Sequence, residues 1–204
     1  NMKNRLSDAL EGIENEERMT CSEFKSWIKE NHKNINLNNF NTQNVRWMGE
    51  MFRSCQSLTS LDVSNFNTEN VEHMDNMFAG CSSLTTLDVS KFDTRNVVQM
   101  YDMFNGCSSL TSLNVSNFNT DKVENIGSMF RDCSKLTTLD VSKFNTQNVV
   151  WMGGMFAGCE SLASLDVSKF NTAKVQDMGY IFENCTSLTS LDVSNFDTRS
   201  ATSM

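Results

Sequence analysis

The sequence predicts an α/β repeat solenoid: a right-handed array with a short parallel β-sheet on one face, helical turns on the other and a helical N-terminal cap. The cysteines supply the first observation, because the six from Cys55 to Cys185 follow one another at a constant interval of 26 residues. Two columns of phenylalanine and one column made almost entirely of methionine keep the same interval. A strict period in this range is typical of stacked repeats.

The composition excludes several classes of protein. The 204 residues carry a formal net charge of −8, which argues against a general binder of nucleic acids or of anionic membranes. No apolar run reaches the roughly 18 residues of a transmembrane helix, so no direct membrane insertion is expected. Hydrophobic residues make up 39% of the chain, which is too many for a disordered protein.

The repeat unit reads L-D-V-S-x-F-x-T-x-x-V-x-x-M-x-x-M-F-x-x-C-x-S-L-T-x and predicts a solenoid domain over 35–204. A propeller blade needs about four strands in 40–45 residues, and a unit of 26 residues with a helical segment leaves no room for them. The expected units are 35–60, 61–86, 87–112, 113–138, 139–164 and 165–190, with a partial unit at 191–204.

Each unit is expected to begin with a strand. Leu58, Leu61 and Val63 give L-x-x-L-x-V, which is close to the core pattern of leucine-rich repeats. The alternation of Leu61 and Val63 around Asp62 indicates a short, half-buried strand. Stacking then places equivalent strands of neighbouring units about 4.8 Å apart in a parallel sheet.

A helical turn is expected after the strand. Between Val71 and Cys81 the apolar residues are three and four positions apart, which predicts one buried face of a helix. Asn67 or Thr68 is the expected N-cap, and Gly80 is an expected C-cap.

The two ends of the chain differ from the repeats. Residues 1–34 lack the period and have helical spacing, with a capping-box pattern at Thr20 and Glu23, which predicts a cap over the first repeat. A partner-binding amphipathic helix is the alternative for this segment. No cap pattern follows the partial unit at 191–204, so end-to-end self-association through this repeat, or a longer natural chain, is expected.

The motifs L-D-V-S-x-F-x-T and M-F-x-x-C-x-S-L-T resemble the repeats of BspA-like bacterial leucine-rich-repeat surface proteins and lipoproteins, over residues 35–204. The resemblance implies a cell-surface or secreted protein, and a role in adhesion or in binding host proteins. The chain shows no leader or anchor, so this location follows from the resemblance alone.

The sulfur-rich columns suggest a metal site at first sight. Met48, Met51 and Cys55 could converge on one face as soft ligands for Cu(I). The same face must form the core, where methionine fills gaps and cysteine behaves as a small hydrophobe. Core packing is therefore the favoured interpretation, with free thiols and no cofactor.

The outward face of the expected sheet carries a column of aspartates. Carboxylates about 4.8 Å apart repel one another, so we expect raised pKa values or a bridging cation or basic ligand. The alternatives are a solvated polar face, a ladder of Ca²⁺ ions, and a binding site for a basic or polar partner. The residues concerned are Asp62, Asp88, Asp140, Asp166 and Asp192, of which the first four are partner-binding candidates.

A second candidate surface is the outward side of the expected helices, where the copies differ most. Exposed aromatic residues are frequent at binding hot spots, although drift at unconstrained positions would also produce such differences. The candidates on this flank are Trp47, His73, Tyr101, Trp151 and Tyr180.

No catalytic motif is present, and a uniform row of aspartates lacks the unlike pair that acid–base catalysis needs. We therefore expect a non-enzymatic binding module, an adhesin-type surface scaffold that recognises a protein or a glycan. A secreted or intracellular effector and a structural spacer remain the alternatives.

Overall fold

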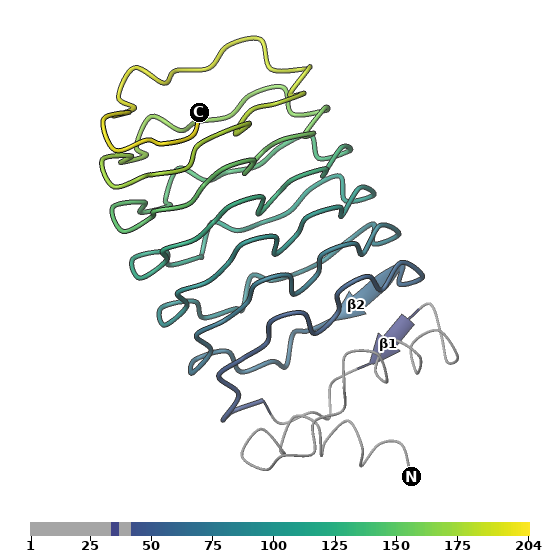
Figure 1. Ribbon diagram of the computed structural model, residues 1–204. Coiled ribbons are helices and arrows are strands. Elements are labelled where there is room, and N and C mark those ends of the chain that lie inside the picture. Colours follow the sequence, from purple (N-terminus) through teal and green to yellow (C-terminus); the bar gives the residue numbers. More distant parts are fainter. Residues whose placement is uncertain (1–33, 37–41) are drawn as a thin grey trace.

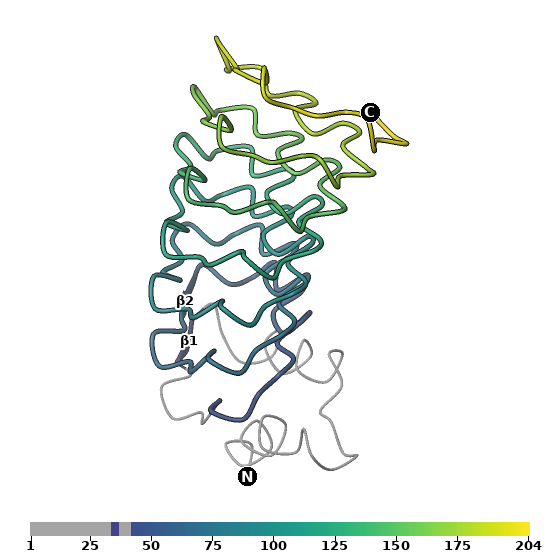
Figure 2. The same ribbon diagram turned by 90° about the vertical axis from the view of Figure 1, so that its left-hand side faces the viewer.

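The computed structural model describes residues 34–36 and 42–204, which form a single stack of similar coils (Figures 1 and 2). Strands β1 (Asn34–Asn36) and β2 (Ser60–Asp62) pair in parallel, with Ile35 opposite Leu61. This register is an offset of one repeat, and it confirms the repeat solenoid. The helical cap expected over 1–34 falls outside the described residues, apart from Asn34 in β1.

The sheet is shorter than the sequence predicts. Beyond β2, the described coils keep an extended segment at the equivalent positions but form an isolated bridge only between Ser112 and Thr138. The backbone contact that continues from β2 is a bond of 3.3 Å from the Thr85 amide to the Thr59 carbonyl. Two paired strands are therefore all that the described residues contribute to a regular sheet.

The helical turns predicted on the other side are wrong, because residues 34–36 and 42–204 contain no helix. Three successive tight turns replace the helix expected between Val71 and Cys81. In each turn an amide donates to the carbonyl three residues earlier, in the pairs Met77–Met74, Ala79–Asn76 and Cys81–Phe78.

The amides between these turn-forming positions donate to the next coil, which explains why no helix forms. An α-helix needs every interior amide for its own bonds to the carbonyls four residues earlier. The backbone reaches the alternating arrangement through positive φ angles of 56° at Asn76 and 74° at Gly80, which occupy the third position of their turns. The inter-coil bonds are Met74–Gln99, Asn76–Tyr101, Phe78–Met103 and Gly80–Asn105.

This side of the solenoid, which we call the ladder flank, holds neighbouring coils together more regularly than the sheet side. Its backbone bonds recur between successive coils, and a column of parallel bridges marks its start. The bridge column consists of Trp47, His73, Gln99, Asn125, Trp151, Asp177 and Ser203.

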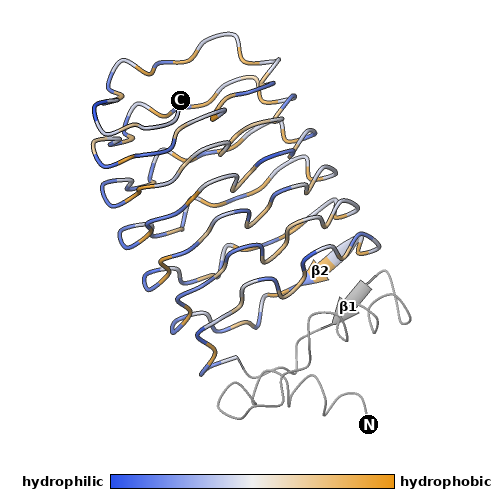
Figure 3. Ribbon diagram, viewed as in Figure 1, coloured by the Kyte–Doolittle hydropathy of each residue, from blue (hydrophilic) through white to orange (hydrophobic). Residues whose placement is uncertain are grey.

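The core is a set of apolar columns, as the sequence predicts. Leu58, Leu61 and Val63 are buried, and hydrophobic stretches recur at equivalent places in successive coils (Figure 3). Phe78 stacks between its equivalents, with ring centroids 5.5 Å from Phe52 and 5.6 Å from Phe104. The spacing of three that suggested a helix belongs to the turns, which also bring every third residue inward.

A column of buried threonines supplies further bonds between coils. Each hydroxyl accepts a hydrogen bond from the amide of the residue 25 positions later and donates one to the carbonyl of the same residue. Thr68 therefore bonds to the next coil, while Asn67 caps a turn by accepting from the Glu69 amide. The column comprises Thr42, Thr68, Thr94, Thr120, Thr146 and Thr172.

Candidate functional site

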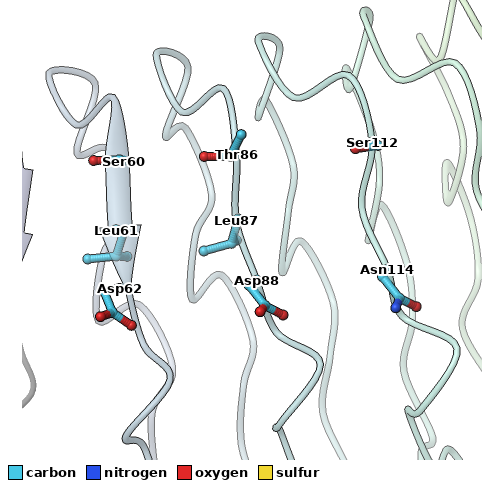
Figure 4. Close-up of a pocket in the computed structure, with 8 residues that line it drawn as sticks. All are labelled: Ser60, Leu61, Asp62, Thr86, Leu87, Asp88, Ser112 and Asn114. Carbon is cyan, nitrogen blue, oxygen red and sulfur yellow. The ribbon is translucent and has the colours of Figure 1, made fainter.

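The sheet face has an open depression of about 500 Å³ across three coils. Its side chains lie in two rows, hydroxyls in one and carboxyl or amide groups in the other, with Leu61 and Leu87 between them (Figure 4). The polar residues are Ser60, Thr86 and Ser112 in the first row and Asp62, Asp88 and Asn114 in the second.

Each aspartate of this face accepts a hydrogen bond from the amide of the serine two residues later, for example Asp88 Oδ1 from Ser90 at 2.9 Å. The serine hydroxyl and then this amide lower the pKa of Asp88, with a further contribution from Lys91, and together they outweigh the repulsion from Asp62. The pKa values of Asp140, Asp166 and Asp192 are lowered by their serines in the same way. Raised pKa values on this face were therefore a wrong expectation.

The aspartate column does not gather into a metal centre. Among the described residues, no group of three or more His, Cys, Asp or Glu side chains could hold a metal ion. Asn114 also interrupts the column between Asp88 and Asp140. What the depression offers is a short row of ionised oxygens beside hydroxyl groups, which is suited to a ligand that donates hydrogen bonds.

On the ladder flank, the structure brings three of the predicted residues together. The rings of Trp47 and His73 lie 5.6 Å apart, and His73 Nδ1 is 3.7 Å from Asp75 Oδ1. Burial raises the pKa of Tyr101, and the charge of Asp75 and a hydrogen bond to it raise it further. The centre of this cluster is Asp75, whose side chain is only 7% exposed and which the sequence analysis missed.

The other two predicted residues of the flank lie elsewhere. Trp151 is four coils from Trp47, a distance of about 19 Å at the usual strand spacing, so the two indoles form no common contact. Trp151 stands between Asn125 and Asp177 in the bridge column, and Tyr180 follows in the next coil with 69% of its surface exposed.

The cysteines belong to the scaffold. Each thiol from Cys81 to Cys185 donates to the carbonyl of a phenylalanine in the preceding coil, as Cys107 Sγ does to Phe78 at 3.2 Å. Burial raises the pKa of Cys107 and of Cys159 to about 12. These groups are therefore protonated hydrogen-bond donors, and the described cysteines form no disulfide with one another.

The described residues include no helix that is long and apolar enough to cross a bilayer.

Comparison with known proteins identifies a family. The family model described as "Mycoplasma protein of unknown function, DUF285" matches residues 20–138 and 110–204. No curated protein matches the sequence. A solved structure, a leucine-rich repeat protein of T. pallidum, is 18% identical over 76% of this chain and 75% of that chain, with a TM-score of 0.37. Because the two structures superpose so loosely, we infer nothing from that protein about the surfaces described above.

Proposed function

The chain belongs to the family described as Mycoplasma protein of unknown function, DUF285, and on that premise we propose that it is a non-enzymatic binding module. Its role is that of an adhesin-type scaffold at the bacterial cell surface or secreted from it. The partner is a protein, and a basic segment of that protein occupies the depression on the sheet face. The observation that supports this most is the pair of neighbouring carboxylates, Asp62 and Asp88, beside a row of hydroxyls.

Charge and geometry both favour a basic partner. The pKa of Asp88 is lowered, so its carboxylate stays ionised over the whole physiological range. A lysine or arginine side chain can donate to two such carboxylates in neighbouring coils, and the hydroxyls of Thr86 and Ser112 can bond to the backbone of the same segment.

The same features argue against an enzyme. Asp88, Asp140 and Asp166 share one environment, and the pKa of each is shifted in one direction. Acid–base catalysis needs two groups whose pKa values are pushed apart.

A paired substitution tests this proposal. The probe is an immobilised peptide of alternating lysine and serine, and the measurement is surface plasmon resonance at several salt concentrations. Replacing Asp62→Asn and Asp88→Asn together should weaken binding about fivefold, because each of the two exposed ion pairs contributes about 0.5 kcal/mol. Affinity should also fall as salt rises.

The matched control is Asp166→Asn with Asp192→Asn, which changes the same column outside the depression and keeps the bonds to the following serines. It should stay within twofold of the parent protein. Equal losses in both variants, or no loss in either, would overturn the proposal. A loss on Trp47→Ala or Trp151→Ala alone would place protein binding on the ladder flank.

A further inference from the structure

Trp151 stands in the bridge column of the ladder flank, between the shorter residues Asn125 and Asp177. Its indole is 43% exposed, and its coil is bridged in parallel to Asn125 on one side and to Asp177 on the other. In the three coils of Asn125, Trp151 and Asp177, four positions that follow the bridge column by two or three residues are glycine, and we call this stretch of backbone the floor. These positions are Gly127, Gly153, Gly154 and Gly179.

The glycines make room for the two polar neighbours of Trp151. A Cβ atom on Gly153 would lie 2.8 Å from Asp177 Oδ2, closer than such contacts normally come. One on Gly127 would lie 3.2 Å from Asn125 Oδ1. Both polar side chains therefore lie close to the backbone of these glycines.

Hydrogen bonds from the floor fix the orientation of both groups. Asn125 Oδ1 accepts from the Gly127 amide at 2.9 Å, and Asp177 Oδ1 accepts from the Gly179 amide at 3.0 Å. Within 34–36 and 42–204, Asn125 Nδ2 and Asp177 Oδ2 have no hydrogen-bond partner. One oriented donor and one oriented acceptor thus lie in the two coils that flank the coil of the exposed Trp151.

We propose that this platform binds a hexose ring of an oligosaccharide. A sugar ring has one face of C–H groups, which packs on the indole of Trp151, and edges of hydroxyl groups, which both donate and accept. Asn125 Nδ2 donates to one hydroxyl, and Asp177 Oδ2 accepts from another. The backbones of Asn125 and Asp177 are two coils apart, about 10 Å, a span comparable to one sugar ring with a hydrogen bond at each edge.

Two further residues limit the chemical class of the ligand. Tyr180, 69% exposed in the adjoining coil, provides an aromatic surface for the next sugar of the chain. The guanidinium of Arg131 reaches the floor, with Nη1 3.4 Å from the Cβ position of Gly154, so a basic peptide would meet a like charge. Asp177 repels an acidic sugar in the same way. The ligand class is therefore a neutral hexose or N-acetylhexosamine chain.

Trp47 provides the matched control. It occupies the same column and is 50% exposed, but its ring lies against His73 and covers Gly49. Its neighbours belong to the cluster around Asp75, whose carboxylate is buried and shared with Tyr101 and His73. An exposed tryptophan of this column without the glycine floor and the oriented pair should not bind sugar.

The experiment uses the full chain on an array of immobilised trisaccharides built from glucose, galactose or N-acetylglucosamine. Every trisaccharide that binds is then titrated in solution, with indole fluorescence as the signal. We expect at least one to bind with Kd below about 1 mM. Trp151→Ala should weaken it at least tenfold and Asp177→Asn about threefold, whereas Trp47→Ala should stay within twofold.

Thermal melting of each variant checks that the coils are intact, which is expected because both indoles are half exposed. Absence of binding to all three trisaccharide types would overturn the proposal, as would binding that survives Trp151→Ala in a folded variant. Binding of the lysine–serine peptide that depends on Trp151 would assign the platform to protein instead. The aspartate variants of the sheet face should leave sugar binding unchanged, so the two proposals fail separately.

Discussion

Replacing Thr120 with valine tests whether buried hydroxyl groups hold neighbouring coils together. Thr120 is 2% exposed, and its Oγ1 accepts from the Asn145 amide at 2.8 Å and donates to the Asn145 carbonyl at 3.0 Å. Valine has nearly the same shape but can form neither bond. The substitution therefore removes two inter-coil hydrogen bonds and leaves the volume of the core unchanged.

The expected cost follows from those two bonds. An intramolecular hydrogen bond contributes about 1 kcal/mol net, so Thr120→Val should reduce the free energy of unfolding by about 2 kcal/mol. For a chain of this length, that corresponds to a melting temperature about 4–8 °C lower. Thr120→Ser keeps the hydroxyl and removes one methyl group, which should cost about 1 kcal/mol.

Urea and thermal unfolding, followed by circular dichroism, measure both variants. The reasoning requires valine to be more destabilising than serine at this position. If serine costs as much as valine or more, apolar packing rather than hydrogen bonding holds this corner, and the role assigned to the threonine column is wrong. The comparison applies equally to Thr94, whose hydroxyl makes the same two bonds to Asn119.

Two further predictions concern titratable groups. Burial raises the pKa of Cys107 and Cys159 to about 12, so iodoacetamide at pH 8 should alkylate these two thiols only as fast as the coils open. The half-buried Cys185 should react before them. Mass spectrometry measures the three rates, and equal rates would contradict this prediction. Because the folded pKa values of Asp88, Asp140 and Asp166 lie below that of an unfolded aspartate, about 3.9, their contribution to stability is complete above that pH and is lost as pH falls through the folded values. Urea midpoints between pH 7 and pH 2 should fall less steeply in Asp140→Asn than in the parent protein.

The repeat and its core were predictable from the sequence because inward positions tolerate only apolar residues. Phe78, Met74 and Cys81 recur at one interval, and the structure buries all three. The same pattern wrongly predicted a helix, since successive tight turns also bring every third residue inward. A distinguishing signal was present in two columns, at the positions of Asn76 and Gly80, where glycine, asparagine or aspartate supplies eight of the twelve positive φ angles.

The candidate site was predicted less completely than the core. The convergence of Trp47, His73 and Tyr101 depends on Asp75, which stands in a column that is otherwise glycine or tyrosine, and this exception was its only sequence signal. The lowered pKa values could have been expected from the spacing D-x-S. An aspartate in this pattern accepts from the hydroxyl and then from the amide of the serine two residues later, and these two contacts decide the direction of the pKa shift.

On the sheet face, a comparison of Asn114 with Asp88 shows which features the turn requires and which it does not. Asn114 accepts from the Ser116 amide at 3.1 Å, the same bond that Asp88 makes to Ser90 at 2.9 Å. An asparagine therefore forms this turn without any charge, so the turn alone does not require aspartate at the other positions. Neighbouring carboxylates also repel, and the coulombic effect of Asp62 on Asp88 is in that direction. This turn therefore does not require the negative charge on the sheet face, which is the physical ground for our proposal that the charge serves the recognition of a basic partner.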